Sequence, residues 1–281
     1  MSLKTKATIR TIVKYVLVFA LMAFILFPFL WLIDCSLKGQ DELFGEPSWF
    51  IKDLYLGGYE WIMSKAGGGI MLPLQNSLIT AGVTMVVTMF FALTSGYALA
   101  RFRFRGKAAF MVMLFACQVF QGPLIMIPWY KLGSALHIIN TKLILILIYG
   151  TITIPVAVTM MSGFFKSVPR DLEEAAYIDG CTRQTCLVKI IIPLVKPGMV
   201  AVAILSFINA WNDYQYAYIL TSTPTSKTVQ ILLNDYIQSI GNMNWTGLLA
   251  GGVIATMPVV ILFAIIQRYL IEGLTAGAVK G

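Results

Sequence analysis

The stretch LILILIYGTITIPVAVTMMSGFF, residues 143–165, contains no charged side chain and is long enough to cross a bilayer as one helix. A helix needs roughly 20 apolar residues to span a hydrocarbon core about 30 Å thick. Five further predominantly apolar stretches of sufficient length lie at residues 15–33, 77–100, 108–130, 199–220 and 247–270. The sequence therefore predicts an all-α membrane protein with six transmembrane helices, which together form one domain over residues 15–270.

The composition supports a membrane protein. Of the 281 residues, 58% are apolar and 12% are charged, whereas a soluble domain has about a quarter of its residues charged. The net charge of +8 comes from short blocks between the apolar stretches, so we interpret it as a topology signal and expect no nucleic-acid partner. Four cysteines without a CxxC pair and a single histidine predict neither a metal site nor structural disulfides.

The distribution of lysine and arginine predicts the orientation of the spans. With six spans, fifteen of these residues fall on the side that holds both termini and six fall on the other side. Loops rich in lysine and arginine stay in the cytoplasm. Residues 1–14 and the tail 271–281 are therefore predicted to be cytoplasmic. The first span has no small-x-small site before Asp34, so we expect it to remain as an anchor.

Prolines and glycines interrupt the apolar stretches. Pro123, Pro128, Pro155 and Pro258 each remove a backbone donor, and the freed carbonyl needs a neighbouring helix or a water-lined cavity. Such breaks are typical of transporters, although structural bundles also contain kinked helices. The GxxxG pair at residues 247 and 251 predicts close packing of the last span.

The loop at residues 166–197 has the pattern of two short helices. Ser167 is expected to cap the first, with Pro169 in its opening turn and Gly180 in the left-handed position that ends it. Thr182 is expected to cap the second, which should stop at Pro193. The predicted apolar face of the first helix consists of Ala175, Ala176 and Ile178. By its pattern alone, this loop is either a docking element or a solvated connector.

The same loop resembles the EAA loop of permease subunits in bacterial ABC importers. The family pattern is E-A-A, three residues, G, nine residues, I-x-L-P, and this chain departs from it only by Ile192 in place of leucine. The resemblance implies a type I importer fold in which this loop is a coupling helix that docks on a separate ATPase. The residues implied in ATPase coupling are Glu174, Ala175, Ala176, Asp179, Gly180, Ile190 and Pro193.

The resemblance extends to other segments and to a subfamily. Residues 76–78, 97–106, 210–214, 267–270 and 273–277 resemble carbohydrate importers, most closely the second permease of maltose-type transporters. That family implies a bacterial inner-membrane protein with three partners: a second permease in a heterodimer, an ATPase dimer and an extracellular or periplasmic sugar-binding protein. No G-x-x-x-x-G-K-[ST] motif occurs, and Gly67-Gly68-Gly69 is interpreted as a turn. We therefore expect no cofactor on this chain, with ATP and magnesium used by the partner ATPase.

A polar, aromatic segment in the fifth span is the predicted substrate path. Asp213 is the one acid that we place within a span, and such a charge is by default a functional candidate. The predicted path consists of Asn209, Trp211, Asn212, Asp213 and Tyr214. Aromatic faces with amide and carboxylate groups suit a sugar. The alternatives are an interfacial aromatic belt and a carboxylate that holds two helices together.

Two further segments have roles that the resemblance implies. The outer loop 221–245 carries Gly241, Asn242, Met243 and Asn244 as a polar tip, which either reaches the binding protein or belongs to a plain connector. The tail is expected to lie extended between the ATPase subunits, with contacts from Gly277, Lys280 and Gly281, although chain ends are generally disordered.

The sequence as a whole predicts a permease subunit of a sugar ABC importer that is not itself an enzyme. A secondary transporter is the alternative within transport, and it would need coupling-ion sites and usually more spans. An intramembrane enzyme would need a catalytic constellation across spans, and neither G-x-S-x-G nor H-E-x-x-H occurs.

Overall fold

The computed structural model describes residues 3–46, 48–65, 67–119, 122–238 and 243–278, and every regular element in these ranges is a helix. Four helices are long and apolar enough to cross a membrane: α1 (Leu3–Ser36), α4 (Met71–Arg101), α7 (Lys142–Ser167) and α14 (Trp245–Ala278). The number reaches six when each of two bent helix pairs is taken as one span. This agrees with the predicted all-α membrane fold.

The third predicted span is broken. Residues 108–130 fall into α5 (Lys107–Val119) and α6 (Pro123–Ala135), whose directions differ by 98°. Gly122 has a φ of 73°, a left-handed conformation that glycine adopts without steric cost, and Pro123 begins α6 without a backbone N–H. The interruption predicted at Pro123 is therefore present, and the stretch is a span broken into two helices.

The fifth predicted span, residues 199–220, is also divided. Helix α11 (Lys196–Asn212) ends before Asp213, which has extended backbone angles, and α12 (Gln215–Leu220) follows. Asp213 therefore lies at a break between two helices and not, as the sequence interpretation assumed, within a continuous helix.

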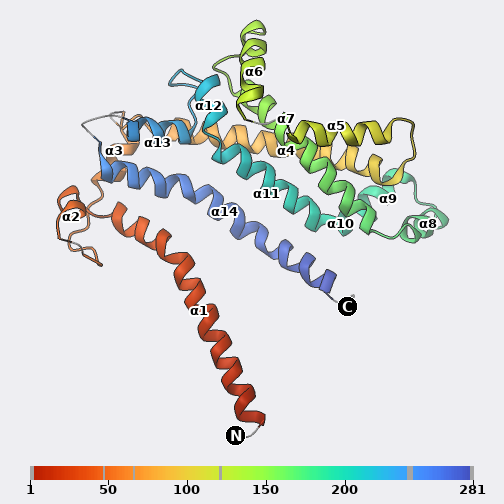
Figure 1. The fold of residues 1–281 in the computed structure, drawn as a ribbon, viewed down its shortest axis with the longest axis horizontal. Helices are drawn as coiled ribbons and strands as arrows, with labels where there is room; N and C mark the ends of the chain where they lie inside the picture. The colour runs from red at the N-terminus through yellow and green to blue at the C-terminus, as the bar shows by residue number, and fades with distance from the viewer. Residues whose placement is uncertain (1–2, 47, 66, 120–121, 239–242, 279–281) are drawn as a thin grey trace. The chain divides into compact units, whose positions relative to one another are not determined.

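One compact unit comprises residues 71–232 and 257–281. Helices α4, α7 and α11 pack on one another, α5 packs on α7, and α12 contacts α6 and α7 (Figure 1). The α4–α7 contact is close at Gly96, where an added Cβ would lie 2.9 Å from the Cβ of Met161. The hydroxyls of Thr88 and Thr153 join the same two helices by a hydrogen bond of 2.9 Å.

The other unit comprises residues 1–70 and 233–256. It contains α1, α2 (Gln40–Phe44), α3 (Gly57–Met63), the end of α13 (Val229–Gln238) and the start of α14. The GxxxG glycines of α14 pack closely, as predicted: a Cβ at Gly247 would meet the Trp61 ring, and one at Gly251 would lie 2.7 Å from Leu233. The predicted turn is also present, since Gly68 and Gly69 have φ values of 68° and 60°.

Candidate functional site

The predicted coupling segment forms two helical pieces. Helix α8 (Asp171–Ile178) ends before Gly180, whose φ of 84° is left-handed as predicted. Helix α9 (Arg183–Cys186) begins after Thr182, whose hydroxyl accepts a 3.2 Å hydrogen bond from the Thr185 N–H. A π-helical turn (Leu187–Ile191) and α10 (Ile192–Leu194) continue this second piece.

The second piece ends at Leu194, one residue after the predicted stop at Pro193, and the chain then bends by 74° into α11. Proline cannot donate to the carbonyl four residues earlier. The wider turn before it uses a bond from the Ile192 N–H to the Leu187 carbonyl.

The start of α8 also differs from the prediction. Ser167 is the last residue of α7, and its hydroxyl donates to the Phe164 carbonyl at 2.8 Å instead of capping α8. Val168, which precedes Pro169, has an extended ψ of 122°, as expected for a residue before proline. The chain therefore leaves the helix there, and α8 begins only at Asp171, after Arg170.

Helix α8 presents one edge to solvent and buries the other. Glu174 and Ala175 are exposed, whereas Glu173 and Ala176, three residues apart, are buried. Of the three residues of the predicted apolar face, Ala176 is buried, whereas Ala175 is exposed and Ile178 is 87% exposed. Of the remaining coupling candidates, Asp179, Gly180 and Pro193 are exposed and Ile190 is half-buried.

An ion pair that the sequence interpretation missed anchors the buried edge of α8. Glu173 Oε1 accepts from Arg101 Nε at 2.5 Å, and Arg101 Nη2 donates to the Val168 carbonyl at 2.9 Å. The two side chains are 9% and 8% exposed. Arg101 is the last residue of α4, so this pair ties α8 to a long helix. The available signal was the three-residue spacing between Glu173 and Ala176, which puts both on one helix face.

The ion pair borders an apolar cluster that includes Tyr97, Phe165, Ala176 and Cys186. Cys186 is fully buried. Burial raises the pKa of the Cys186 thiol.

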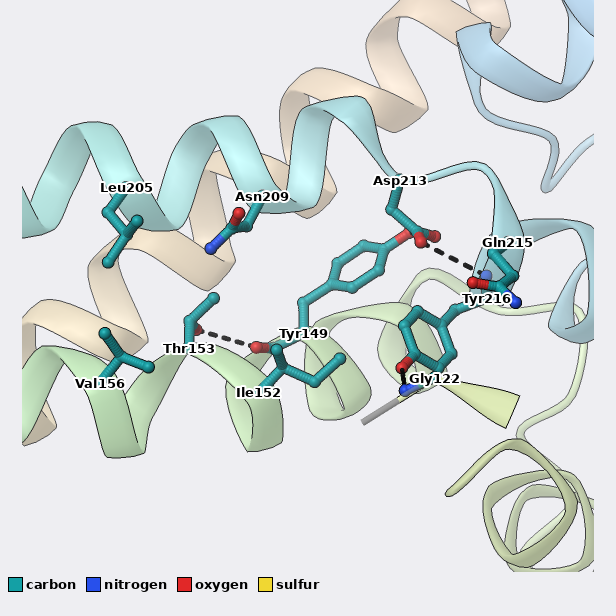
Figure 2. Close-up of a pocket in the computed structure, with 10 residues that line it drawn as sticks. All are labelled: Gly122, Tyr149, Ile152, Thr153, Val156, Leu205, Asn209, Asp213, Gln215 and Tyr216. Atoms are coloured by element: carbon teal, nitrogen blue, oxygen red, sulfur yellow. Dashed lines mark hydrogen bonds between the residues drawn. The ribbon is translucent and has the colours of Figure 1, made fainter. Parts of the chain in front are cut away.

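A cavity of about 560 Å³ lies at the break between α11 and α12. Figure 2 shows its lining: Gly122, Tyr149, Ile152, Thr153, Val156, Leu205, Asn209, Asp213, Gln215 and Tyr216. Apolar side chains of α7 and α11 line one end, and Asp213 with both tyrosines lies at the other. The volume falls within the range of roughly 300–1,000 Å³ typical of ligand pockets.

Asp213 connects the elements around this cavity. Its Oδ2 accepts from the Tyr149 hydroxyl at 2.8 Å and from the Ala217 N–H at 3.0 Å, and its Oδ1 accepts from the Tyr216 N–H at 3.4 Å. The carboxylate thus caps α12 and ties it to α7. These are the contacts expected from the alternative in which Asp213 holds two helices together.

The cavity includes some of the predicted path residues. Asn209 and Asp213 line it, whereas Trp211 is buried and stacks on Phe207, with ring centroids 5.5 Å apart. Asn212 and Tyr214 are not among the lining residues. The lining residues that the predicted path omitted include Tyr149, Thr153, Gln215 and Tyr216.

The Tyr216 hydroxyl accepts from the Gly122 N–H at 2.9 Å, so the broken third span also contributes to the cavity. The only signal for Tyr149 was its position as a polar residue within an apolar stretch.

The predicted binding-protein tip is only partly described. Gly241 and Asn242 lie outside the described residues, and Met243 and Asn244 are half-buried. The Asn244 Oδ1 accepts from the Gly247 N–H at 2.9 Å and from the Thr246 hydroxyl at 2.8 Å. Asn244 therefore caps the start of α14 instead of forming part of a free polar tip.

The tail differs from the predicted extended segment. Helix α14 continues through Gly277 to Ala278, because a glycine in a helix costs only about 1 kcal/mol relative to alanine and does not by itself end it. Lys280 and Gly281 lie outside the described residues.

Over the part of the chain that the structure describes, no three side chains of His, Cys, Asp or Glu come together as metal ligands would.

Comparisons with known proteins give consistent matches. Residues 89–275 match the family described as "Binding-protein-dependent transport system inner membrane component". The chain is 35% identical over 257 residues to the sulfoquinovosyl glycerol transport system permease protein SmoH of Agrobacterium fabrum, covering 91% of this chain and 89% of that protein. It is 32% identical to the trehalose/maltose transport system permease protein MalG of Thermococcus litoralis, covering 93% and 94%.

The fold is similar to a chain in the crystal structure of a bacterial ABC transporter involved in the import of the acidic polysaccharide alginate. The TM-score is 0.78 at 23% identity, with 96% of this chain and 98% of that chain covered.

Proposed function

Because the chain belongs to the family of binding-protein-dependent transport system inner membrane components, we propose that it is a permease subunit of a sugar ABC importer. It forms half of a heterodimeric translocation pathway with a second permease. A sugar-binding protein delivers the substrate on the outer side, and an ATPase dimer docks on the cytoplasmic side. The family is one of transport components, which disfavours an intramembrane enzyme.

The assignment to sugars is supported by the named substrates of the relatives and by the cavity. The two permeases compared above belong to systems for a sugar glycerol conjugate and for disaccharides. The cavity combines amide, phenol and carboxylate groups with an apolar end, a lining suited to a hydroxyl-rich ring.

The observation that carries the coupling role is the two-sided burial of α8. Its inner edge is ion-paired to Arg101, so the helix is held rigidly, while Glu174 and Ala175 on the outer edge remain available to a partner. A docking lever needs both properties. The sequence contains no phosphate-binding loop motif, so ATP and magnesium are assigned to the partner ATPase.

The lysine and arginine distribution favours cytoplasmic termini, which puts α8 and the tail on the ATPase side. We infer that Gly277, Lys280 and Gly281 contact the ATPase dimer from the end of α14. The outer segment around residues 241–244 is proposed to approach the binding protein.

The test is reconstitution of this chain with the second permease, the ATPase and the binding protein in proteoliposomes. ATP-dependent uptake is measured over a panel of labelled sugars. Uptake of at least one sugar that requires all four components supports the proposal. Uptake that persists without the ATPase and follows an ion gradient would identify a secondary transporter.

Coupling is tested in the same preparation by Glu174→Ala. This exposed residue should be dispensable for insertion and assembly, so ATP hydrolysis should no longer drive uptake while the amount of complex is unchanged. Normal uptake by this variant would remove Glu174 from the coupling role.

A further inference from the structure

The described lining of the cavity at the α11–α12 break carries one negative charge and no positive charge. Among the described residues that line it, Asp213 is the single carboxylate, and none is lysine, arginine or histidine. The other polar groups are neutral: the amides of Asn209 and Gln215 and the hydroxyls of Tyr149, Thr153 and Tyr216.

The hydrogen bonds around the cavity leave specific groups available to a ligand. The Asp213 carboxylate accepts from the Tyr149 hydroxyl and from backbone N–H groups of residues 215–217, so its charge is held at the cavity wall. The Tyr149 hydroxyl gives its proton to Asp213 and remains an acceptor. The Tyr216 hydroxyl accepts from Gly122 and keeps its proton to donate. A ligand with many O–H groups matches this set, because each hydroxyl both donates and accepts.

We propose that this cavity is a sugar subsite contributed by this chain, selective for uncharged sugars, and that the carboxylate of Asp213 excludes anionic ones. The proposal rests on the proposed function and adds the charge class of the substrate. An anionic group in the cavity would face Asp213 without a cation to neutralise either charge. Like charges that face each other repel, and a preference of about tenfold, which corresponds to about 1.4 kcal/mol, is expected.

This selectivity would distinguish the chain from two systems that it resembles. Sulfoquinovosyl glycerol carries a sulfonate, and alginate is an acidic polysaccharide. The charge class proposed for this chain rests on the lining of its cavity and not on similarity to those proteins.

Matched sugar pairs isolate the charge. Glucosylglycerol and sulfoquinovosyl glycerol differ in one hydroxyl replaced by a sulfonate, and mannotriose and trimannuronate differ in carboxylates. Binding of each radiolabelled sugar to the solubilised importer complex is measured by equilibrium dialysis without binding protein, which removes selection by that partner. The neutral member of at least one pair should bind about tenfold more tightly than its anionic counterpart.

Asp213→Asn should bring the two dissociation constants of that pair within about twofold, because asparagine removes the charge and keeps an oxygen for Tyr149 and for the start of α12. Binding of the neutral sugar by the variant also shows that it is folded. Tyr149→Phe keeps the charge and should keep the preference. Glu60→Gln, an exposed position of α3 outside the cavity lining, removes the same charge and should change nothing.

Three results would each overturn the inference. The original complex could bind both members of each pair equally, the preference could persist in Asp213→Asn, or none of the four sugars could show saturable binding. Failure of the proposed function would look different, since no sugar of the uptake panel would then be transported by the complete importer.

Discussion

Glu173 and Glu174 are adjacent in the sequence and should nevertheless respond oppositely to substitution. Glu173→Gln removes the partner of Arg101, whose side chain is 8% exposed and donates to the Glu173 carboxylate and to the Val168 carbonyl. Breaking a buried ion pair by removing one member costs about 3–5 kcal/mol, because it leaves a desolvated charge without its counterion. Glu174→Gln changes an exposed side chain, so its effect on stability should stay within about 0.5 kcal/mol.

Cys186 provides the assay because it is fully buried in the cluster beside this ion pair. In a variant with Cys35, Cys117 and Cys181 replaced by serine, a fluorogenic maleimide reports when Cys186 becomes accessible on heating. Glu173→Gln should lower the temperature of this transition by several degrees, and Glu174→Gln should leave it unchanged.

A double variant separates the ion pair from the local shape. Replacing both Arg101 and Glu173 by methionine removes the charges together, and such apolar replacements of buried pairs are often neutral or stabilising. The double variant should therefore be more stable than Glu173→Gln. Equal transition temperatures for Glu173→Gln and Glu174→Gln would refute the conclusion that the ion pair holds α8 on α4.

Three further results are expected. Gly96→Ala should destabilise the protein by about 1–3 kcal/mol, because its Cβ would press on the backbone and side chain of α7. Gly82→Ala in the same helix meets nothing within 4 Å and should leave the stability unchanged. The thermal transitions of the two variants measure this difference. Asn244→Ala should cost about 1 kcal/mol through the lost cap of α14, and Asn244→Asp should preserve most of the stability in the same assay. Cys186 should resist maleimide at pH 8 until denaturant is added, because burial blocks access and raises the thiol pKa, which lowers the thiolate fraction. Mass spectrometry of labelled peptides measures the extent of reaction. Rapid labelling of the native protein would contradict the buried position.

The membrane character and the approximate spans could be predicted because hydropathy is averaged over about 20 residues. A single polar residue or an error of a few residues at an end therefore changes this average little. The turn chemistry at Gly180 and Thr182 was also readable, since each acts through its own backbone or near neighbours. These are local signals. The prediction that Ser167 caps α8 was wrong because α7 continues to Ser167. Hydropathy identifies a span but does not mark the residue at which its helix ends.

The buried edge of α8 could not be predicted from the loop alone. Glu173 is buried because Arg101, 72 residues earlier in the chain, neutralises it, and the only local hint was the spacing to Ala176. The resemblance directed the interpretation to Glu174, the first residue of the E-A-A motif. Contacts between distant segments decide which of two adjacent acids is exposed, and a single sequence does not record them.

The error in placing Asp213 has a physical cause that links the break to the cavity. When a helix breaks at membrane depth, the first N–H groups of the next helix lose their partners and must be satisfied within the protein. Asp213 accepts from the N–H groups of Tyr216 and Ala217, so the carboxylate compensates for the break that it occupies. A continuous helix would have needed no such acceptor, and the charge would have been costly there. The same geometry turns the Tyr149 hydroxyl toward Asp213 and opens the space lined by Asn209 and Gln215. Capping α12 and charging the cavity are thus two consequences of one side chain, which is why the structural and functional interpretations of Asp213 do not exclude each other.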